Sequence, residues 1–143
     1  MLMEPIISGQ LVQDLIPQKA PFVMIDKMLA FGENTITAGL TVAVDNIFVE
    51  NGRFNESGIV EHMAQSVALY TGYQFYLKNE PAPTGYIGSV KDVVILELPL
   101  PGEDIVTEVN VLHEFMGVTL VDIVTKRNNI KIASGQMKTV LAQ

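Results

Sequence analysis

The sequence contains no cysteine and only two histidines. The absence of cysteine excludes disulfide bridges, thiolate metal sites and a cysteine nucleophile. Basic residues are also few, because nine lysines and arginines stand against sixteen aspartates and glutamates, which gives a formal net charge of −7. Neutralising the phosphates of a nucleic acid requires clustered basic residues, so we expect no nucleic-acid partner.

Long apolar runs are missing as well. The longest uncharged stretch near the middle of the chain covers 63–77 and includes glutamine and serine, whereas a transmembrane helix needs about 20 mostly apolar residues. The opening residues, MLMEPIISG, lack the basic region with which a secretory signal peptide begins. We therefore expect a cytoplasmic protein with no membrane span.

Hydrophobic residues are nevertheless abundant. They make up 48% of the 143 residues, charged residues make up 17%, and the mean hydropathy is +0.30. This composition excludes a disordered chain and supplies enough apolar side chains for a core. We expect a single domain over residues 1–143, and the surplus of apolar residues indicates further burial between subunits.

The first part of the chain predicts a short helix and two strands. The helix covers 10–16 and ends at Pro17, which cannot continue a helix. Strands are expected over 22–31 and 36–44, the second of them from its alternation of apolar and polar residues.

A long helix and four further strands complete the pattern. Ser57 is the expected N-cap of a helix over about 58–78, which is apolar on most of its circumference and therefore typical of a buried helix. The later strands are expected over 85–97, with a kink at Gly88, and over 104–114, 117–126 and 130–142, the last three as an antiparallel meander. This order indicates an α+β fold, in which a curved antiparallel sheet of about six strands wraps one long central helix and a second subunit covers the rest of it.

The long helix also carries the main candidate for chemistry. At 100° per residue, Glu61, Gln65, Ala68 and Gly72 fall on one narrow stripe. A glutamate is costly to bury on an apolar helix unless it has partners or a function, and in an apolar cleft its carboxyl group would suit general acid or base catalysis. The alternative is a solvent-exposed glutamate that interacts with the helix dipole near the helix start.

Three segments, in order, resemble one enzyme family. LIPQKAPFVMIDKML resembles the L-P-H-R-x-P-F-x-x-x-D opening of bacterial 3-hydroxyacyl-acyl-carrier-protein dehydratases, IVEHMAQSVA resembles their I-I-E-A-x-A-Q helix, and LPLPGEDIVTEVNVL resembles their V-P-G-D-x-L-x-x-x-V segment. With the strand pattern, the likeness covers nearly the whole chain. The resemblance implies the hot-dog fold, and the greatest similarity is to the dehydratase-like proteins of aryl-polyene-type gene clusters.

The resemblance also implies a reaction and its residues. In these dehydratases a histidine removes the C2 proton of the acyl thioester, and an acidic helix residue from the other subunit helps to expel the 3-hydroxyl group as water. Glu61 matches the acidic position, and Gln65 matches the residue that orients it. The family also implies a homodimer, or a trimer of such dimers, acting on an acyl group carried by acyl carrier protein or coenzyme A, with no metal or cofactor.

Four residues are predicted to bind the substrate. Asn46, Phe48 and Gly58 lie in the loop before the helix or at its start, and Ala68 lies on the stripe of Glu61. The amide of Asn46 is a possible donor to the thioester carbonyl, although asparagine in such a loop is also ordinary turn chemistry.

The sequence departs from the family at the catalytic histidine. The family places this residue in an H-F-P motif before the helix, where this chain has Ile47, and Gln18 replaces the histidine of the L-P-H block. His62 follows Glu61 directly and should point about 100° away from it. His113 ends a predicted strand near a turn, which indicates a surface residue.

The missing histidine leaves three interpretations open. We favour a 3-hydroxyacyl-[acyl-carrier-protein] dehydratase-like enzyme. The alternatives are a hot-dog thioesterase that uses Glu61, and a non-catalytic acyl-binding or heterodimer-partner subunit. Four basic residues, Lys19, Lys27, Arg53 and Lys91, are candidates for a local rim that receives an acidic carrier protein.

Overall fold

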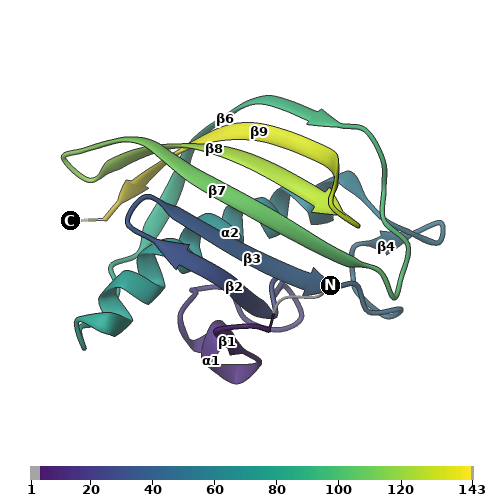
Figure 1. Ribbon diagram of the computed structural model, residues 1–143, viewed down its shortest axis with the longest axis horizontal. Helices are drawn as coiled ribbons and strands as arrows, with labels where there is room; N and C mark the ends of the chain where they lie inside the picture. Colours follow the sequence, from purple (N-terminus) through teal and green to yellow (C-terminus); the bar gives the residue numbers. More distant parts are fainter. Residues whose placement is uncertain (1–3, 143) are drawn as a thin grey trace.

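The computed structural model describes residues 4–142, in which one long helix lies against a curved antiparallel sheet (Figure 1). The helices are α1 (Gln10–Asp14) and α2 (Glu56–Leu77). The strands are β1 (Ile7–Ser8), β2 (Lys27–Gly32), β3 (Thr35–Thr41), β4 (Val49–Glu50), β5 (Arg53–Phe54), β6 (Gly85–Ile95), β7 (Asp104–Phe115), β8 (Val118–Arg127) and β9 (Ile130–Leu141).

Seven of the strands form one sheet in the order β1-β2-β3-β7-β8-β9-β6, and every neighbouring pair is antiparallel. The sheet arches over α2, and the short β4–β5 hairpin precedes the helix (Figure 1). This arrangement confirms the α+β hot-dog fold and the β7–β9 meander, with seven strands in the sheet where about six were expected. Neither helix within residues 4–142 has the length and hydrophobicity that crossing a membrane requires.

The core lies between α2 and the concave face of the sheet. On α2 it includes Ile59, Met63 and Leu69, each fully buried, and on the sheet it includes Ile36 and Val109. One side of α2 is only half-buried, however, so the helix is not enclosed on all sides within one chain. The half-buried side of α2 carries Glu61 and Ala68.

Several element boundaries differ from the prediction, and two of the differences concern α2 and the segment packed against it. The N-cap of α2 is Asn55 rather than Ser57: Asn55 has an extended backbone, and its Oδ1 accepts a hydrogen bond from the Gly58 N–H at 2.9 Å. Ser57 lies inside the first turn instead, so its side chain cannot cap the helix. The strand predicted over 22–31 begins only at Lys27, because the backbone before it is bonded to side chains of α2.

The backbone after α1 crosses α2 at Gly72. A Cβ atom on Gly72 would lie 1.9 Å from the carbonyl oxygen of Leu15, which is far inside contact distance. Glycine is therefore required where these two backbones meet. The contact holds residues after α1 against the open side of α2.

We predict that Gly72→Ala destabilises the protein by about 1–3 kcal/mol, because the added methyl group forces the two backbones apart. Gly85→Ala is a matched control: its Cβ would meet no atom closer than 3.6 Å, so its effect should stay within about 0.5 kcal/mol. Urea unfolding of the three proteins measures the difference. Equal stability of the two variants would contradict the close contact at Gly72.

Candidate active site

A cavity of about 430 Å³ opens beside the half-buried side of α2. Glu61, Ala64 and Ala68 line it from the helix, the segment 14–18 lines it from one side, and the segment 81–87 lines it from the other. The alanines leave space that larger side chains would fill. The cavity is therefore a slot along the helix with a carboxylate in its wall.

Gln65 holds Glu61 in place. Its Nε2 donates to Glu61 Oε2 at 2.7 Å and to the Phe22 carbonyl at 2.8 Å, and its Oε1 accepts from the Met24 N–H at 2.6 Å. The Gln65 side chain is fully buried, so these bonds satisfy an amide that would otherwise be costly to bury. Because Met24 supplies a donor, the amide oxygen must face Met24, and the amide nitrogen must face Glu61.

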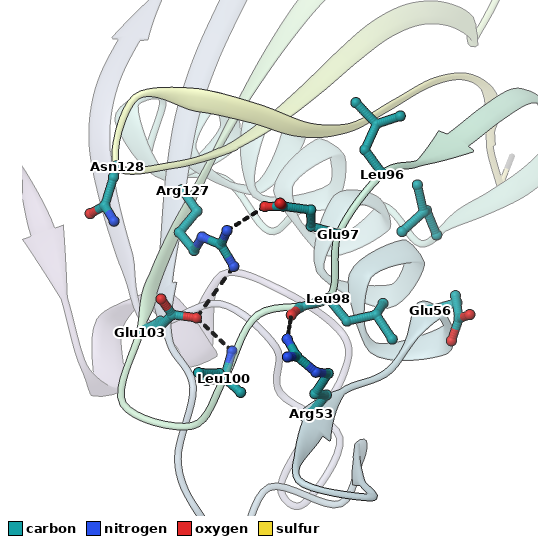
Figure 2. A pocket seen from close by; sticks show the side chains of 10 residues that line it. Arg53, Glu56, Leu96, Glu97, Leu98, Leu100, Glu103, Arg127 and Asn128 are labelled. Carbon is teal, nitrogen blue, oxygen red and sulfur yellow. Dashed lines mark hydrogen bonds and ion pairs between the residues drawn. The ribbon is translucent and has the colours of Figure 1, made fainter.

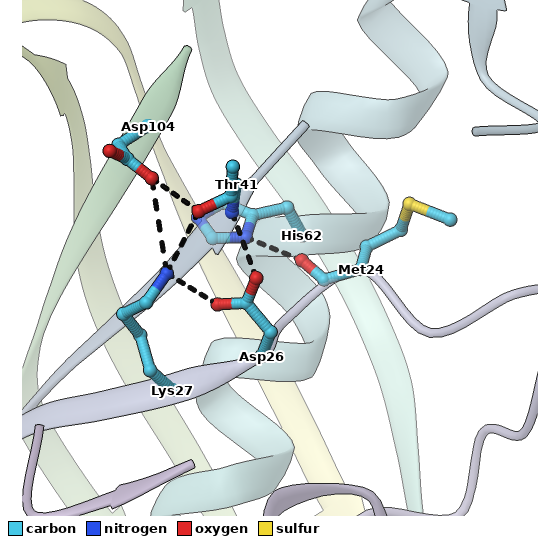
Figure 3. Close-up of polar contacts among 6 residues, drawn as sticks. All are labelled: Met24, Asp26, Lys27, Thr41, His62 and Asp104. Carbon is cyan, nitrogen blue, oxygen red and sulfur yellow. Dashed lines mark hydrogen bonds and ion pairs between the residues drawn. The ribbon is translucent and has the colours of Figure 1, made fainter. Parts of the chain in front are cut away.

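His62 points towards the Met24 carbonyl (Figure 3) and does not line the cavity, as its step of about 100° from Glu61 predicts. Its Nδ1 donates to the Met24 carbonyl at 2.7 Å, and its buried Nε2 has no hydrogen-bond partner among residues 4–142. Burial lowers the pKa of His62 to about 4, against the opposing effects of the Met24 carbonyl and Asp26. His62 is thus a neutral, buried side chain that holds the backbone at Met24. It does not line the cavity of Glu61.

A network of charged and polar groups lies beside His62 at the start of β2 (Figure 3). Lys27 Nζ lies 2.6 Å from Asp26 Oδ1 and donates to Thr41 Oγ1 at 3.2 Å. The other oxygen of Asp26 accepts from the Thr41 N–H at 3.0 Å, and Thr41 Oγ1 also donates to Asp104. Lys27 is therefore occupied within its own chain.

The residues predicted before the helix gather elsewhere. Asn46 Oδ1 accepts from the Phe48 N–H at 2.9 Å, and Asn46 Nδ2 faces Met24 Sδ at 3.3 Å. Phe48 packs against the core, and a Cβ on Gly58 would meet Phe54 at 2.6 Å and Phe48 at 2.8 Å. Asn46, Phe48 and Gly58 thus lie together beneath the helix start, whereas Glu61 and Ala68 line the cavity.

A second, open hollow of about 730 Å³ lies near the 95–103 loop (Figure 2). Arg127 points between Glu97 and Glu103 and forms ion pairs with both. Arg53 donates to the Leu98 carbonyl at 2.9 Å. Since both guanidinium groups are already bonded within the chain, this hollow is a weaker candidate for an acyl site than the Glu61 cavity.

The remaining predicted rim residues do not form one cluster with Arg53. Lys19 Nζ donates to the carbonyls of Gln13 and Ile16, at 2.6 and 3.0 Å. Lys91 lies on the exposed edge strand β6. Since Lys27 is also paired within the chain, the four basic residues make separate contacts and do not form the predicted rim.

Sequence reasoning missed the roles of Phe22 and Met24. Both act through backbone groups, which bond to Gln65 and His62 across 38 to 43 positions of the chain. Side-chain type carries no signal for such bonds. The available sign was the presence of polar residues, His62 and Gln65 among them, on a helix that is apolar on most of its circumference.

Comparisons with known proteins define the class to which this fold and site belong. The ApeP-like family model, described as ApeP dehydratase, matches residues 10–141. A 3-hydroxyacyl-[acyl-carrier-protein] dehydratase FabZ of Vibrio atlanticus is 30% identical over 137 residues, covering 89% of this chain and 88% of the relative. An uncharacterised thioester dehydrase of Halalkalibacterium halodurans is 27% identical over 133 residues, covering 87% and 83%.

Solved structures share the fold at low identity. The dehydratase heterocomplex ApeI:P from Xenorhabdus doucetiae matches with a TM-score of 0.79 at 17% identity, covering 99% of this chain and 93% of that chain. A hypothetical thioesterase with coenzyme A from Streptococcus pneumoniae matches with a TM-score of 0.66 at 8% identity, covering 81% and 84%. The protein is a hot-dog protein of the dehydratase type. It belongs to the ApeP-like dehydratase family.

We predict that His62 makes stability depend on pH. Its folded pKa of about 4 lies below the ordinary histidine value of 6.5, so between these pH values the unfolded chain binds a proton that the folded chain does not. Stability should therefore fall as the pH falls from about 6.5 towards 4, by on the order of 3 kcal/mol. Urea unfolding across this pH range measures the slope.

Two variants isolate the effect. His62→Asn keeps a donor near the position of Nδ1 but does not titrate, so its stability should fall less over the same pH range. His113→Asn changes an exposed histidine and should retain the wild-type slope. Parallel curves for wild type and His62→Asn would show that His62 is not the responsible group.

Proposed function

We propose that the chain is the acid-bearing subunit of a two-chain 3-hydroxyacyl-[acyl-carrier-protein] dehydratase. The observation that carries this proposal is the pair of Glu61 and Gln65 in the wall of the cavity, where Gln65 is bonded on both sides. Membership of the ApeP-like family and the FabZ relatives support a dehydratase reaction on a carrier-protein thioester. The acyl chain would lie in the slot along α2, past Ala64 and Ala68.

In the proposed reaction, a base removes the proton from C2 of the 3-hydroxyacyl thioester. The electron pair of that C–H bond forms the C2=C3 double bond, and the C3–O bond breaks. Glu61, in its protonated form, donates its proton to the departing hydroxyl group, so that water and the enoyl thioester leave. Before the next turnover the base releases the proton that it took from C2, and the carboxylate of Glu61 regains one, so that no net proton is consumed. Gln65 orients Glu61 through the hydrogen bond to Oε2.

The cavity has no histidine base among the described residues that line it. The chain's only histidines are His62 and His113; His62 is buried against Met24, and His113 is exposed on β7 with its ring near Phe115. A second copy of the chain would bring the same two residues. We therefore place the base on a different chain, which agrees with the description of the ApeI:P neighbour as a heterocomplex.

The edge strand β6 is the proposed surface for that partner. Within residues 4–142 it pairs with β9 alone, and it exposes Tyr86, Ile87, Val90 and Val94, by 45 to 61% of each residue's surface. An unpaired apolar edge is a template for a strand of another chain. Because Tyr86 and Ile87 also line the Glu61 cavity, a partner at this edge would complete the cavity wall.

The family resemblance implies a homodimer or a trimer of dimers, and the oligomeric state of the purified chain tests both. The molar mass of the purified chain, alone and after co-expression with a hot-dog dehydratase that carries the H-F-P histidine, distinguishes the assemblies. Cytoplasmic location stays a prediction, which fractionation of cells that express a tagged chain would test.

We predict that Glu61→Gln lowers dehydration by the two-chain complex by at least about 100-fold, because an amide cannot donate the proton that expels water. The measurement is formation of the enoyl product from a 3-hydroxyacyl-carrier protein. Glu56→Gln is the matched control, since Glu56 is an exposed glutamate on the first turn of the same helix, and it should keep wild-type activity.

Other outcomes would point elsewhere. Full dehydration by the chain without a partner would contradict the two-chain proposal. Release of free thiol from a saturated acyl thioester, with no enoyl product, would instead support the thioesterase alternative. Unchanged activity of Glu61→Gln would show that the acid is another residue.

A further inference from the structure

Gln18 stands out among the polar residues that line the Glu61 cavity, because it has a buried side-chain atom without a hydrogen-bond partner within residues 4–142. It lines the cavity together with Glu61. Its Oε1 is buried and has no hydrogen-bond partner within residues 4–142. A buried amide oxygen without a partner costs free energy. The Glu61–Gln65 pair does not use Gln18, so its function is unaccounted for.

The backbone around Gln18 is firmly held. Lys19 Nζ donates to the carbonyl of Ile16 at 3.0 Å, and Ile16 itself is buried with 3% of its surface exposed. The Leu15 carbonyl lies directly against Gly72 of α2. The Gln18 side chain, whose Oε1 lacks a hydrogen-bond partner, therefore belongs to a part of the cavity wall that is held against α2.

Two anchors place Gln18 alongside α2. Leu15 contacts the helix at Gly72, and the carbonyl of Phe22 accepts a hydrogen bond from Gln65. Between these points the chain runs in the opposite direction to α2, and Gln18 lies within this stretch. An acyl chain that starts at Glu61 and follows the helix would pass along the wall that contains Gln18.

We infer that Gln18 contacts the substrate, and that its carboxamide hydrogen-bonds a hydroxyl group on the acyl chain. A hydroxyl group can donate to Oε1, and the broad terminal torsion of glutamine lets the amide turn its oxygen towards the cavity at little cost. The inference rests on the proposed function in one respect, namely that an acyl chain occupies this cavity. The hydroxyl group belongs either to C3 at the reacting end or to the far end of the chain.

The test compares ligand binding by two forms of the two-chain complex, one with the wild-type chain and one with Gln18→Met. The methionine puts an apolar side chain of similar length at this position. The ligands are three non-cleavable acyl-pantetheine thioethers of equal length: a saturated one, a 3-hydroxy one and an ω-hydroxy one. Titration calorimetry gives each dissociation constant. Gln18→Met should weaken one hydroxylated ligand by roughly three- to tenfold, the effect of one hydrogen bond, and should leave the saturated ligand unchanged or tighter.

The hydroxylated ligand that loses affinity identifies the position of the hydroxyl group. Thermal unfolding of the free protein adds an independent readout: Gln18→Met should raise the midpoint, because it removes a buried oxygen without a partner, whereas loss of a structural contact would lower it. Gln136→Met is the control, since it breaks a 2.8 Å hydrogen bond to Asp122 on the sheet and should leave all three dissociation constants unchanged.

Two results would overturn the inference. One is an equal loss of affinity for all three ligands in Gln18→Met, which would show that Gln18 shapes the cavity but does not bind a hydroxyl group. The other is unchanged discrimination between saturated and hydroxylated ligands. Both are separate from failure of the proposed function, because binding of these analogues requires no turnover and Glu61→Gln tests the chemistry on its own. Failure of all three ligands to bind the wild type would remove the acyl cavity and both proposals with it.

Discussion

The buried amide of Gln65 is the contact on which the rest of the site depends. One side chain joins α2 to the extended segment before β2, through its bonds to Phe22 and Met24, and holds Glu61 as well. Burying an amide is favourable only when all these bonds form together. The docking of that segment and the orientation of the carboxylate therefore depend on the same side chain.

A second consequence concerns the shape of the cavity. The segment 15–22 is attached to α2 at both ends, by the backbone contact at Gly72 and by the hydrogen bond from Gln65. His62 strengthens the second attachment through its hydrogen bond to the Met24 carbonyl. The segment contacts α2 at these two points, and between them the cavity separates the segment from the helix. Thus the same contacts that stabilise the fold also keep a wall of the proposed acyl site at a set distance from Glu61.

The sequence predicted those features that depend on local periodicity. The helical stripe brought Glu61 and Ala68 to one cavity and placed His62 off it, and alternation located β3 and the β7–β9 meander. It failed where long-range bonds decide the outcome. The stretch 22–26 has the composition of a strand but bonds to helix side chains. The choice of Asn55 over Ser57 as N-cap depends on where the chain turns into the helix, which neighbouring residue types do not specify.

The placement of histidine follows from the same physics. The protein has two histidines. His62, which follows Glu61 in the sequence, helps to pack the helix against the backbone at Met24 and does not line the cavity. Burial keeps its imidazole neutral, and its Nδ1 proton is committed to a carbonyl group. A base for C2 would have to be near the cavity, unpaired and able to accept a proton, and neither histidine meets these conditions. Under the proposed function, the carboxylate of Glu61, the Gln65 amide and the apolar edge of β6 would form one half of an active site whose histidine comes from another chain.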